Sequence, residues 1–407
     1  MSLNQHHYDI VIIGGGITGL AGAYYLTQAG KKVLLLEKKE IGGGASGSCD
    51  DMIFLQSKKP GIMLSLALYS LELYRRLEKD LPLPLDLETR GGMVLIETPE
   101  QLKVMKNFVE QQQQLGLDVR FLEKDEMRKL QPHVSPHVLA STYSPLDSQV
   151  NPLKVMRAFA YAAGQKGLTV KKGTAPRKFR MIGDRSWEIT STNGEKFIAE
   201  TVLVAAGAWT PEVTKLVGLD VPILPKRGQI AVTEQVPPLG QTNVWSADYI
   251  VMKLDPTLSL GRPALLDELG IGLSLSQTHD GNYFIGGTRE YAGFEKTTHF
   301  AALHLMIKEA TRFIPLLKNV HIIRSFAGLR PASDDGKPFI GEVPGLPGFF
   351  LAAGHEGDGI ALAPVTGKII AQMITGNSLP AELQEHDLQE LSPARLFLSQ
   401  DTLQHSG

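Results

Sequence analysis

The sequence of 407 residues is longer than one ordinary hydrophobic core accommodates, so we expect two domains. Hydrophobic residues make up 43% and charged residues 21%, a globular balance, and the formal net charge of −2 excludes a basic surface for nucleic acid. The single cysteine, Cys49, excludes an internal disulfide and fits a reducing compartment. Neither a bilayer-spanning apolar run nor a secretory signal pattern is recognisable, so we expect a cytoplasmic protein, with attachment to a membrane surface left open.

The first informative stretch begins with residues 8–13, whose β-branched composition predicts a buried parallel strand, followed by a predicted helix over 17–30. A second predicted strand, 32–36, delivers Glu37, whose carboxylate can accept hydrogen bonds from ribose hydroxyls. In a dinucleotide site the glycines between strand and helix allow a tight turn, the approach of a pyrophosphate and close helix packing, and here they are Gly14, Gly16 and Gly19. The alternative is a glycine-rich turn of another α/β protein. The complete pattern favours dinucleotide binding, and Glu37 argues against NADP while leaving NAD and FAD open.

The loop after Glu37 is crowded with glycine and small polar residues and contains Cys49, Asp50 and Asp51. Backbone donors in such a loop could form a second phosphate cradle, and the alternative is a flexible surface loop. Its position directly after the ribose carboxylate favours the cradle.

Helices are predicted over 61–79, 101–115, 151–163 and 300–312, and strands over 88–97, 169–172, 187–192, 196–205 and 222–235. Asn151 and Pro152 provide an N-cap followed by proline at the first helical position. The glutamines at 111–114 are interpreted as a solvated helix end, and 247–291 as β-rich. Near the C-terminus a strand (349–353), a glycine turn (354–359) and a helix (360–374) follow one another.

Six motifs then occur in one order along nearly the whole chain: Gly14-x-Gly16-x-x-Gly19 with Glu37, Gly43-Gly-Ala-Ser-Gly, Val202-Leu-Val-Ala-Ala-Gly-Ala-Trp, Gly328-Leu-Arg-Pro, Asp335-Gly-Lys-Pro-Phe-Ile-Gly, and Gly354-His-x-x-x-Gly-Ile-x-Leu-Ala-Pro-x-Thr-Gly. In these motifs the chain resembles the flavin-dependent amine and amino-acid oxidoreductases of the D-amino-acid oxidase type, and most closely the glycine oxidases. The resemblance implies an α/β fold with a Rossmann-type FAD-binding domain and an inserted β-rich α+β substrate domain. It also implies FAD as a non-covalent cofactor.

Under this resemblance the FAD-binding domain comprises 1–85, 145–220 and 325–380, the substrate domain 86–144 and 221–324, and a C-terminal tail 381–407. The cofactor contacts that it implies begin with the pyrophosphate turn at Gly14, Gly16, Ile17, Thr18 and Gly19. The other implied contacts are Glu37, Lys38, Ala45, Ser46, Pro176, Ala206, Gly207, Trp209, Gly354, Glu356, Gly357, Asp358, Gly359 and Ile360.

Arg330 matches the arginine that binds the substrate carboxylate, and a guanidinium suits this task because its parallel donors fix orientation as well as charge. The alternative for Arg330 is a structural ion pair. His355 is expected mainly to pack or hydrogen-bond beside the flavin, with a catalytic role as the second reading. No metal site is expected.

The sequence also departs from the family pattern around the substrate. Gly357 stands where glycine oxidase has an additional arginine, and the family's carboxylate-binding tyrosine falls near Ser274, next to an inserted stretch at 254–270 that makes this alignment unsafe. With Gly357, Asp50 and Asp51 as substrate contacts, the hypothesis is an acidic wall that favours a bulkier or secondary-amine substrate. The alternative is that the aspartates cap a turn and face solvent.

The resemblance implies oxidation of the C–N bond of an amino acid or secondary amine, by hydride transfer from the α-carbon to flavin N5 and hydrolysis of the imine. One rival is the flavoprotein subunit of a heteromeric opine, hydroxyproline or glycine dehydrogenase, which passes electrons to partner subunits. Another is a non-catalytic flavin-binding protein. An NAD-dependent dehydrogenase is disfavoured by the C-terminal turn. A small-molecule substrate and a homo-oligomer or heteromer are expected.

Overall fold

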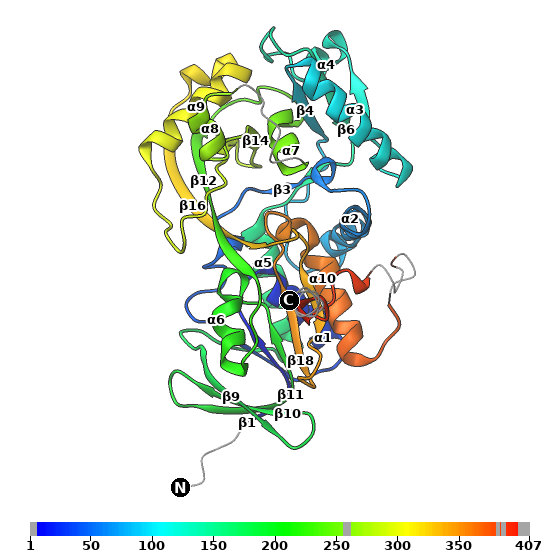
Figure 1. Ribbon diagram of the computed structural model, residues 1–407, viewed down its shortest axis with the longest axis vertical. Helices are drawn as coiled ribbons and strands as arrows, with labels where there is room; N and C mark the ends of the chain where they lie inside the picture. The colour runs from blue at the N-terminus through cyan, green and yellow to red at the C-terminus, as the bar shows by residue number, and fades with distance from the viewer. Residues whose placement is uncertain (1–5, 255–261, 380–382, 384–387, 398–407) are drawn as a thin grey trace, which may run out of the picture.

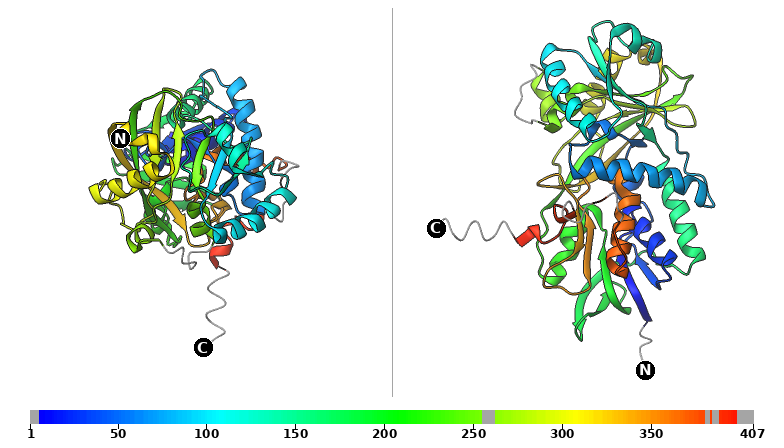
Figure 2. Two further views of the ribbon diagram at one scale, coloured as in Figure 1. Left: turned by 90° about the horizontal axis from the view of Figure 1, so that it is seen from above. Right: turned by 90° about the vertical axis from the view of Figure 1, so that its right-hand side faces the viewer.

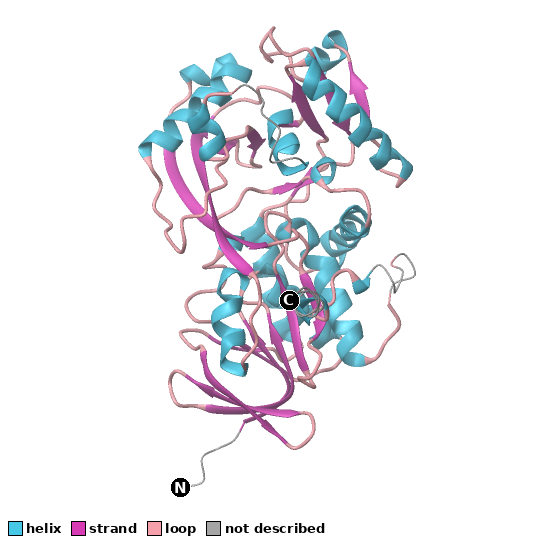
Figure 3. Cartoon of the chain, in the orientation of Figure 1, coloured by secondary structure: helices cyan, strands magenta, loops and turns pink. Residues whose placement is uncertain are grey.

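The computed structural model describes residues 6–254, 262–379, 383 and 388–397, which form two lobes (Figure 1). One lobe contains the N-terminal strand and the sheet around it, and the other contains a second sheet with its own helices. Two long strands, β12 (Ile223–Gln235) and β16 (Ile322–Ser333), run from one lobe to the other and are paired along most of their length (Figures 1 and 3).

The sheet of the N-terminal lobe is built around strands that are apolar on both faces, because helices cover one face and a β-hairpin with apolar side chains covers the other. Its main path consists, in order, of β17 (Phe339–Glu342), β18 (Phe349–Ala353), β11 (Lys196–Val204), β1 (His6–Ile13), β2 (Val33–Leu36) and β8 (Thr169–Lys171). The five strands from β18 to β8 are parallel, and the hairpin β9 (Pro176–Ile182) and β10 (Ser186–Ser191) joins β11 antiparallel. This is the α/β architecture that the sequence predicts.

Four helices carry most of the first core: α1 (Ile17–Gln28), α2 (Ile62–Asp80), α5 (Pro152–Gln165) and α10 (Gly359–Thr375). Helices α1 and α10 pack very closely, because a Cβ built on Gly367 of α10 would lie 2.6 Å from the carbonyl carbon of Ala21 in α1. This close packing fixes the two helix N-termini relative to each other. Two short elements, α6 (Thr210–Thr214) and the 3₁₀ turn η4 (Lys215–Val217), follow β11.

The second sheet is mixed and runs β16, β12, β15 (Asn282–Gly286), β14 (Ser274–Gln277), β13 (Asn243–Ser246), β4 (Gly92–Ile96), β6 (Ala140–Ser144) and β5 (Arg120–Leu122). Around it lie α3 (Pro99–Gln114), α4 (Lys124–Leu130), α7 (Ala247–Leu254), α8 (Ala264–Glu268), α9 (Phe300–Phe313) and the 3₁₀ turn η5 (Pro315–Asn319). A small ladder of β3 (Met52–Ile53) and β7 (Ser148–Gln149) lies between the lobes (Figure 1). Figure 2 shows in its right-hand view that α2 also lies at this level of the molecule.

The strands of the second sheet come from the two segments that the sequence assigns to a substrate domain, except that β16 continues to Ser333. The exact domain boundaries stay predictions. The N-cap at Asn151 is confirmed, because its side chain accepts hydrogen bonds from the backbone N–H groups of Leu153 and Lys154.

Two interpretations of the sequence are confirmed only in part. Residues 247–291 are not uniformly β-rich, since they begin with α7 and also contain α8. The glutamine run is solvated at Gln111, Gln113 and Gln114, which are exposed. Gln112 is the exception, since it is fully buried and its amide donates to the carbonyls of Gln56 and Lys58 at 3.0 Å. A buried amide that satisfies two backbone carbonyls has no signature in local sequence, because its partners are more than fifty residues away.

The described part of the C-terminal tail packs against the N-terminal lobe. Leu391 is fully buried in the first core, and its carbonyl accepts a hydrogen bond from the Ile340 N–H at 2.8 Å.

Candidate active site

A cavity lies where four neighbouring parallel strands end at the same edge of the first sheet. Strands β1, β11 and β18 are followed by small residues (Gly14, Ala205 and Gly354), and β2 is followed by Glu37. Small residues at strand ends leave room for a ligand in the crevice outside the carboxyl edge of the sheet. The cavity continues from this edge to the face of β12 and β16 in the second lobe.

Two glycines at the turn after β1, Gly14 and Gly19, could not be replaced without moving the backbone. Gly14 has a φ of +113°, and a Cβ there would lie 2.5 Å from the carbonyl oxygen of Ala205. A Cβ on Gly19 would lie 2.1 Å from the carbonyl oxygen of Gly14, so Gly19 lets α1 pack against the turn. At Gly16 a Cβ would meet only the Ser46 hydroxyl at 3.3 Å, because this position faces the cavity.

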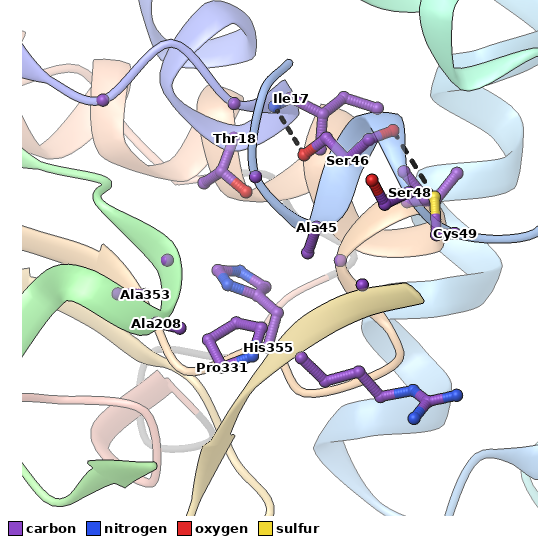
Figure 4. Close-up of a pocket in the computed structure, with 18 of the residues that line it drawn as sticks. Ile17, Thr18, Ala45, Ser46, Ser48, Cys49, Ala208, Pro331, Ala353 and His355 are labelled. Atoms are coloured by element: carbon purple, nitrogen blue, oxygen red, sulfur yellow. Dashed lines mark hydrogen bonds between the residues drawn. The ribbon is translucent and has the colours of Figure 1, made fainter. Parts of the chain in front are cut away.

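Glu37 and Ser46 tie the neighbouring loops to this turn. One oxygen of the Glu37 carboxylate accepts from the Gly15 N–H at 2.8 Å, and the other accepts from the Lys39 N–H at 2.7 Å. The Ser46 hydroxyl, in the 3₁₀ turn η1 (Ala45–Gly47), accepts from the N–H of Ile17 at 3.1 Å (Figure 4). The loop after β2 therefore folds over the N-terminus of α1, as expected of a second cradle and not of a free surface loop.

The structure brings most of the expected cofactor contacts to the cavity. Its lining includes Gly14, Gly16, Ile17, Thr18, Glu37, Lys38, Ala45, Ser46, Ala206, Gly207, Trp209, Glu356, Gly357, Gly359 and Ile360. Four expected contacts lie outside the lining: Gly19, Pro176, Gly354 and Asp358. Gly19 and Gly354 pack against other parts of the protein and not against the cavity, and Pro176 is buried at the start of β9.

The turn at 354–359, before α10, is held in place by a buried lysine that the sequence analysis did not identify. Lys58 follows the 3₁₀ turn η2 (Leu55–Ser57), and its side chain is 2% exposed. Its ammonium lies 2.7 Å from the Asp358 carboxylate and donates to the carbonyl of Phe54 at 2.8 Å. Asp358 is the N-cap of α10, so this ion pair fixes the start of the helix whose first N–H groups face the cavity.

Arg330 lies on β16, is half-buried, and lines the cavity from the strands that reach the second lobe. One terminal nitrogen, Nη1, donates to the carbonyl of Thr288 at 2.9 Å. The guanidinium occupies the space above Gly228, where a Cβ would be only 2.3 Å away. Within the described part of the chain no carboxylate forms an ion pair with Arg330, so the structural ion pair considered for this residue is absent there.

His355 lies in the middle of the labelled side chains, close to Pro331 (Figure 4). It is 3% exposed, and its Nε2 shares a hydrogen bond with the Thr366 hydroxyl at 3.0 Å. Burial lowers the pKa of His355 to about 4, so its imidazole is neutral at physiological pH. A neutral, hydrogen-bonded ring supports the packing role expected for this residue.

The two neighbouring aspartates point to different places. Asp50 lines the main cavity, where burial raises the pKa of its carboxyl against the opposing positive charge of Arg330. Asp51 lines a neighbouring cavity and accepts a hydrogen bond from the Ser276 hydroxyl at 2.6 Å. Burial raises the pKa of Asp51 to about 7. Asp51 therefore does not line the same cavity as Asp50, and the acidic wall of two aspartates stays a prediction.

Gly357 lacks the positive charge of the additional arginine that glycine oxidase has at this position. Another arginine, Arg289, brings a positive charge to the same place. The guanidinium of Arg289, which follows β15, lies 3.9 Å from the position of a Cβ on Gly357. Arg289 donates to the hydroxyl of Tyr249 at 3.0 Å, and Tyr249 lines the cavity from α7. Sequence comparison alone missed both residues, because it placed a family tyrosine near Ser274, which lies on β14 and does not line this cavity.

These features together fit a dinucleotide cofactor. A glycine turn that faces the cavity, an acid after β2 and two helix N-termini form an extended set of donors and space of the kind that a pyrophosphate and a ribose need. Across the described ranges no group of three or more His, Cys, Asp or Glu side chains could hold a metal ion. In the same residues no helix is both long and apolar enough to cross a membrane.

Comparisons with known proteins show which family and which structures the chain is similar to. The family model of FAD dependent oxidoreductases matches residues 9–373. Glycine oxidase from Geobacillus kaustophilus (strain HTA426) is 29% identical over 378 residues, covering 91% of this chain and 93% of that protein. A crystal structure of glycine oxidase from Geobacillus kaustophilus superimposes with a TM-score of 0.82 over 95% of this chain and 98% of that chain at 26% identity. The hydrogen cyanide synthase subunit HcnC from Pseudomonas protegens (strain DSM 19095 / LMG 27888 / CFBP 6595 / CHA0) is 27% identical over 418 residues, covering 93% of this chain and 94% of that protein.

The family model spans both lobes and every element that lines the cavity, from the turn after β1 to the N-terminus of α10. The chain therefore belongs to the family of FAD dependent oxidoreductases.

Proposed function

We propose that this protein oxidises the C–N bond of an amino acid or a secondary amine that carries an α-carboxylate. The observation that carries the proposal is the position of Arg330, whose half-buried side chain lines the cofactor cavity beside the turn at 354–360. When bound, FAD supplies the acceptor for the hydride that leaves the α-carbon.

Arg330 orients the substrate in this proposal. A guanidinium holds a carboxylate through two parallel N–H donors, which fixes the direction of the α-carbon as well as the charge. The bond from Nη1 to the Thr288 carbonyl holds the guanidinium plane. Holding the reacting carbon in one position accounts for a large part of the rate in reactions that need no side-chain nucleophile.

Asp50 lies in the same cavity and is close enough to Arg330 for that positive charge to oppose the effect of burial on its pKa. A substrate whose carboxylate is held by Arg330 then has its amino group on the side of Asp50. The Asp50 carboxylate can accept a hydrogen bond from that nitrogen or take its proton. The neutral imidazole of His355 adds no charge here.

The first N–H groups of α10 act on the other side of the cavity. Gly359 and Ile360 open the helix and line the cavity, and the N–H groups of a first helical turn have no partner within the helix. They favour negative charge in front of them.

The proposal is tested with the purified protein under anaerobic conditions. We expect a visible flavin absorbance that bleaches on addition of glycine, N-methylglycine or another amine from a panel of amino acids and N-substituted amino acids. If dithionite bleaches the flavin and no amine in a broad panel does, the proposed function is wrong.

A second candidate concerns the electron acceptor. The similarity to the HcnC subunit, which covers 93% of this chain, favours a flavoprotein subunit that transfers electrons to partner subunits. Oxygen consumption by the reduced protein separates the two forms. Rapid reoxidation by oxygen supports an oxidase, whereas slow reoxidation with rapid reduction of an artificial dye supports a dehydrogenase subunit. A protein whose flavin no amine reduces is the non-catalytic alternative.

A further inference from the structure

Strands β12 and β16 present two basic side chains next to each other on one face. Lys226 and Arg330 are directly opposite in the antiparallel register, so their side chains leave the sheet on the same side. Two residues further along the same face the opposite pair is Gly228 and Gly328. Because Gly228 has no side chain, the guanidinium of Arg330 can lie over it.

A third basic side chain reaches this face from the other edge of β12. Arg227 and Glu290 form an isolated bridge, with both of their backbone N–H groups donating to the opposite carbonyl. Continuing that antiparallel register places Arg289 opposite Gly228 and Tyr291 opposite Lys226. The contact of the Lys226 ammonium with the Tyr291 ring, 4.9 Å from its centroid, agrees with this register. We call Lys226, Arg289 and Arg330 the basic face.

The basic face meets the cofactor cavity at Gly357. A Cβ built on Gly357 would lie 3.6 Å from Nε of Arg330 and 3.9 Å from Nη2 of Arg289. Two guanidinium groups are therefore within reach of a single small ligand beside this residue, which itself lines the cavity. A larger residue at 357 would fill the space between them.

The protein satisfies the hydrogen-bonding capacity of Arg289 only in part. Among the described residues Arg289 makes one hydrogen bond, to the Tyr249 hydroxyl, and its guanidinium lies 4.6 Å from the centroid of the Tyr249 ring. Its distance to the Glu356 carboxylate is 3.5 Å, which is long for a hydrogen bond. Within the described residues its buried Nε has no partner. A buried donor without an acceptor is costly, so an anionic ligand group is its natural complement.

The charges around the cavity also favour an anionic group on the ligand. Beside the three cations of the basic face lie two carboxylates: Asp50, which lines the cavity, and Glu356, 3.5 Å from Arg289. Burial lowers the pKa of Lys226, and the charges of Arg289 and Arg330 lower it further, against the effect of Glu356. A substrate with a second carboxylate places a further negative charge beside this basic face, whereas a simple amino acid does not.

We propose that the substrate carries a second carboxylate, which Arg289 and Lys226 bind while Arg330 holds the α-carboxylate. This inference rests on the proposed function, since it names the substrate class of the same site. Two kinds of compound have this chemistry: acidic amino acids, and amino acids with a carboxyalkyl group on the nitrogen.

A binding experiment tests the second carboxylate without turnover. Dicarboxylates that lack a C–N bond (malonate, succinate, glutarate) and the matching monocarboxylates (acetate, propionate, butyrate) are titrated into the FAD-loaded protein, and the change in flavin absorbance is followed. We expect at least one dicarboxylate to bind tenfold or more tightly than its monocarboxylate. In Arg289→Gln this preference is lost, and in Arg289→Lys, which keeps the charge, part of it remains.

Arg185→Gln is the matched control, because it makes the same substitution at an exposed arginine of the other lobe that pairs with Glu342 at 3.4 Å. This variant keeps the preference of the parent. If the parent protein binds both series equally, the inference is wrong whatever the variants do. If Arg289→Gln fails to bind FAD, Lys226→Met and the parent titrations decide the outcome.

Anaerobic reduction then distinguishes the two kinds of substrate. N-(carboxymethyl)glycine is compared with N-methylglycine, and both enantiomers of aspartate and glutamate are compared with asparagine and glutamine. At least tenfold faster reduction by the dicarboxylate member of one pair supports the inference and identifies the kind of compound. Equal reduction within every pair overturns the inference and leaves the proposed function intact. If no compound reduces the flavin while dithionite does, the proposed function fails. The titrations alone then decide whether the basic face binds a second carboxylate.

Discussion

A guanidinium differs from an ammonium in holding its donors in one plane, and in Arg330 this plane is fixed by the Thr288 carbonyl and by the space over Gly228. Arg330→Ala leaves a substrate carboxylate without its partner, which costs about 2–5 kcal/mol for a buried charge pair. We expect unchanged flavin absorbance and a reduction that saturates only at far higher substrate concentration. Arg330→Lys restores charge without the fork and recovers part of the loss. Rapid-mixing kinetics that match the parent in both variants would assign Arg330 a structural role.

Asp51 makes folding depend on pH. Burial raises its pKa from 3.8 to about 7, so between these values the folded protein binds more protons than the unfolded protein. Stability is therefore lost as the pH rises through this window. In Asp51→Asn the side chain cannot ionise, so between pH 5 and 7.5 we expect the free energy of unfolding to fall by on the order of 2 kcal/mol more in the parent than in this variant.

Denaturant titrations of the FAD-loaded protein at both pH values measure this difference. The control is Asp220→Asn, which changes an aspartate whose side chain is 88% exposed. Equal pH dependence in the parent and Asp51→Asn would show that Asp51 stays ionised in the folded protein.

At the scale of the element, different glycines of the turn between β1 and α1 are needed for folding and for cofactor binding. Gly19→Val places a branched side chain against the carbonyl of Gly14, where even a Cβ would be 2.1 Å away, so we expect misfolded or colourless protein. At Gly16 a Cβ meets only Ser46 at 3.3 Å, so Gly16→Ala should fold and yet bind FAD more weakly. Flavin content after purification and the thermal midpoint of the apoprotein measure the two effects separately.

Gly164 in α5 provides the control for these substitutions. A Cβ there meets nothing within 4 Å, so Gly164→Ala should stabilise the helix by up to about 1 kcal/mol and leave flavin content unchanged. A folded Gly19→Val protein with full flavin occupancy would refute the assignment of this turn.

At the scale of the whole molecule, a buried polar network connects the two lobes beneath the cavity. Gln112 of α3 donates to the carbonyl of Lys58, and the Lys58 ammonium pairs with Asp358 at the start of α10. Next to it, Asp147 accepts from the side-chain amide of Gln56 at 2.6 Å. The network therefore positions the N-terminus of α10 relative to the second sheet.

Lys58→Met removes one partner of a buried ion pair, which typically costs about 3–5 kcal/mol because the other charge stays buried. The matched control is Lys172→Met, since Lys172 pairs with Glu40 at 2.7 Å with side chains that are 53% and 73% exposed. We expect a loss of about 0–1 kcal/mol in this control. Denaturant titrations compare the two variants, and similar losses in both would mean that Lys58 does not stabilise the junction.

Local sequence was sufficient for the part of the site that one short stretch builds. The strand, the glycine turn, the helix and Glu37 lie within thirty residues, and their spacing encodes backbone requirements that only glycine and a carboxylate meet. The same holds for the helix that begins after Asn151, because a cap and its helix are neighbours in sequence. The six motifs predicted the family, and the match over residues 9–373 confirms it.

Tertiary structure decided everything that depends on strand register and on contacts between distant segments. Asp50 and Asp51 are adjacent in sequence, and only the folded chain shows that they face different cavities. Arg289 and Gly357 are separated by more than sixty residues, so the return of a positive charge to this position was invisible before the strands were paired. Sequence determines which backbone can bind a dinucleotide, whereas the pairing of β12 with its neighbours determines which charges meet the substrate, because register places distant side chains on one face.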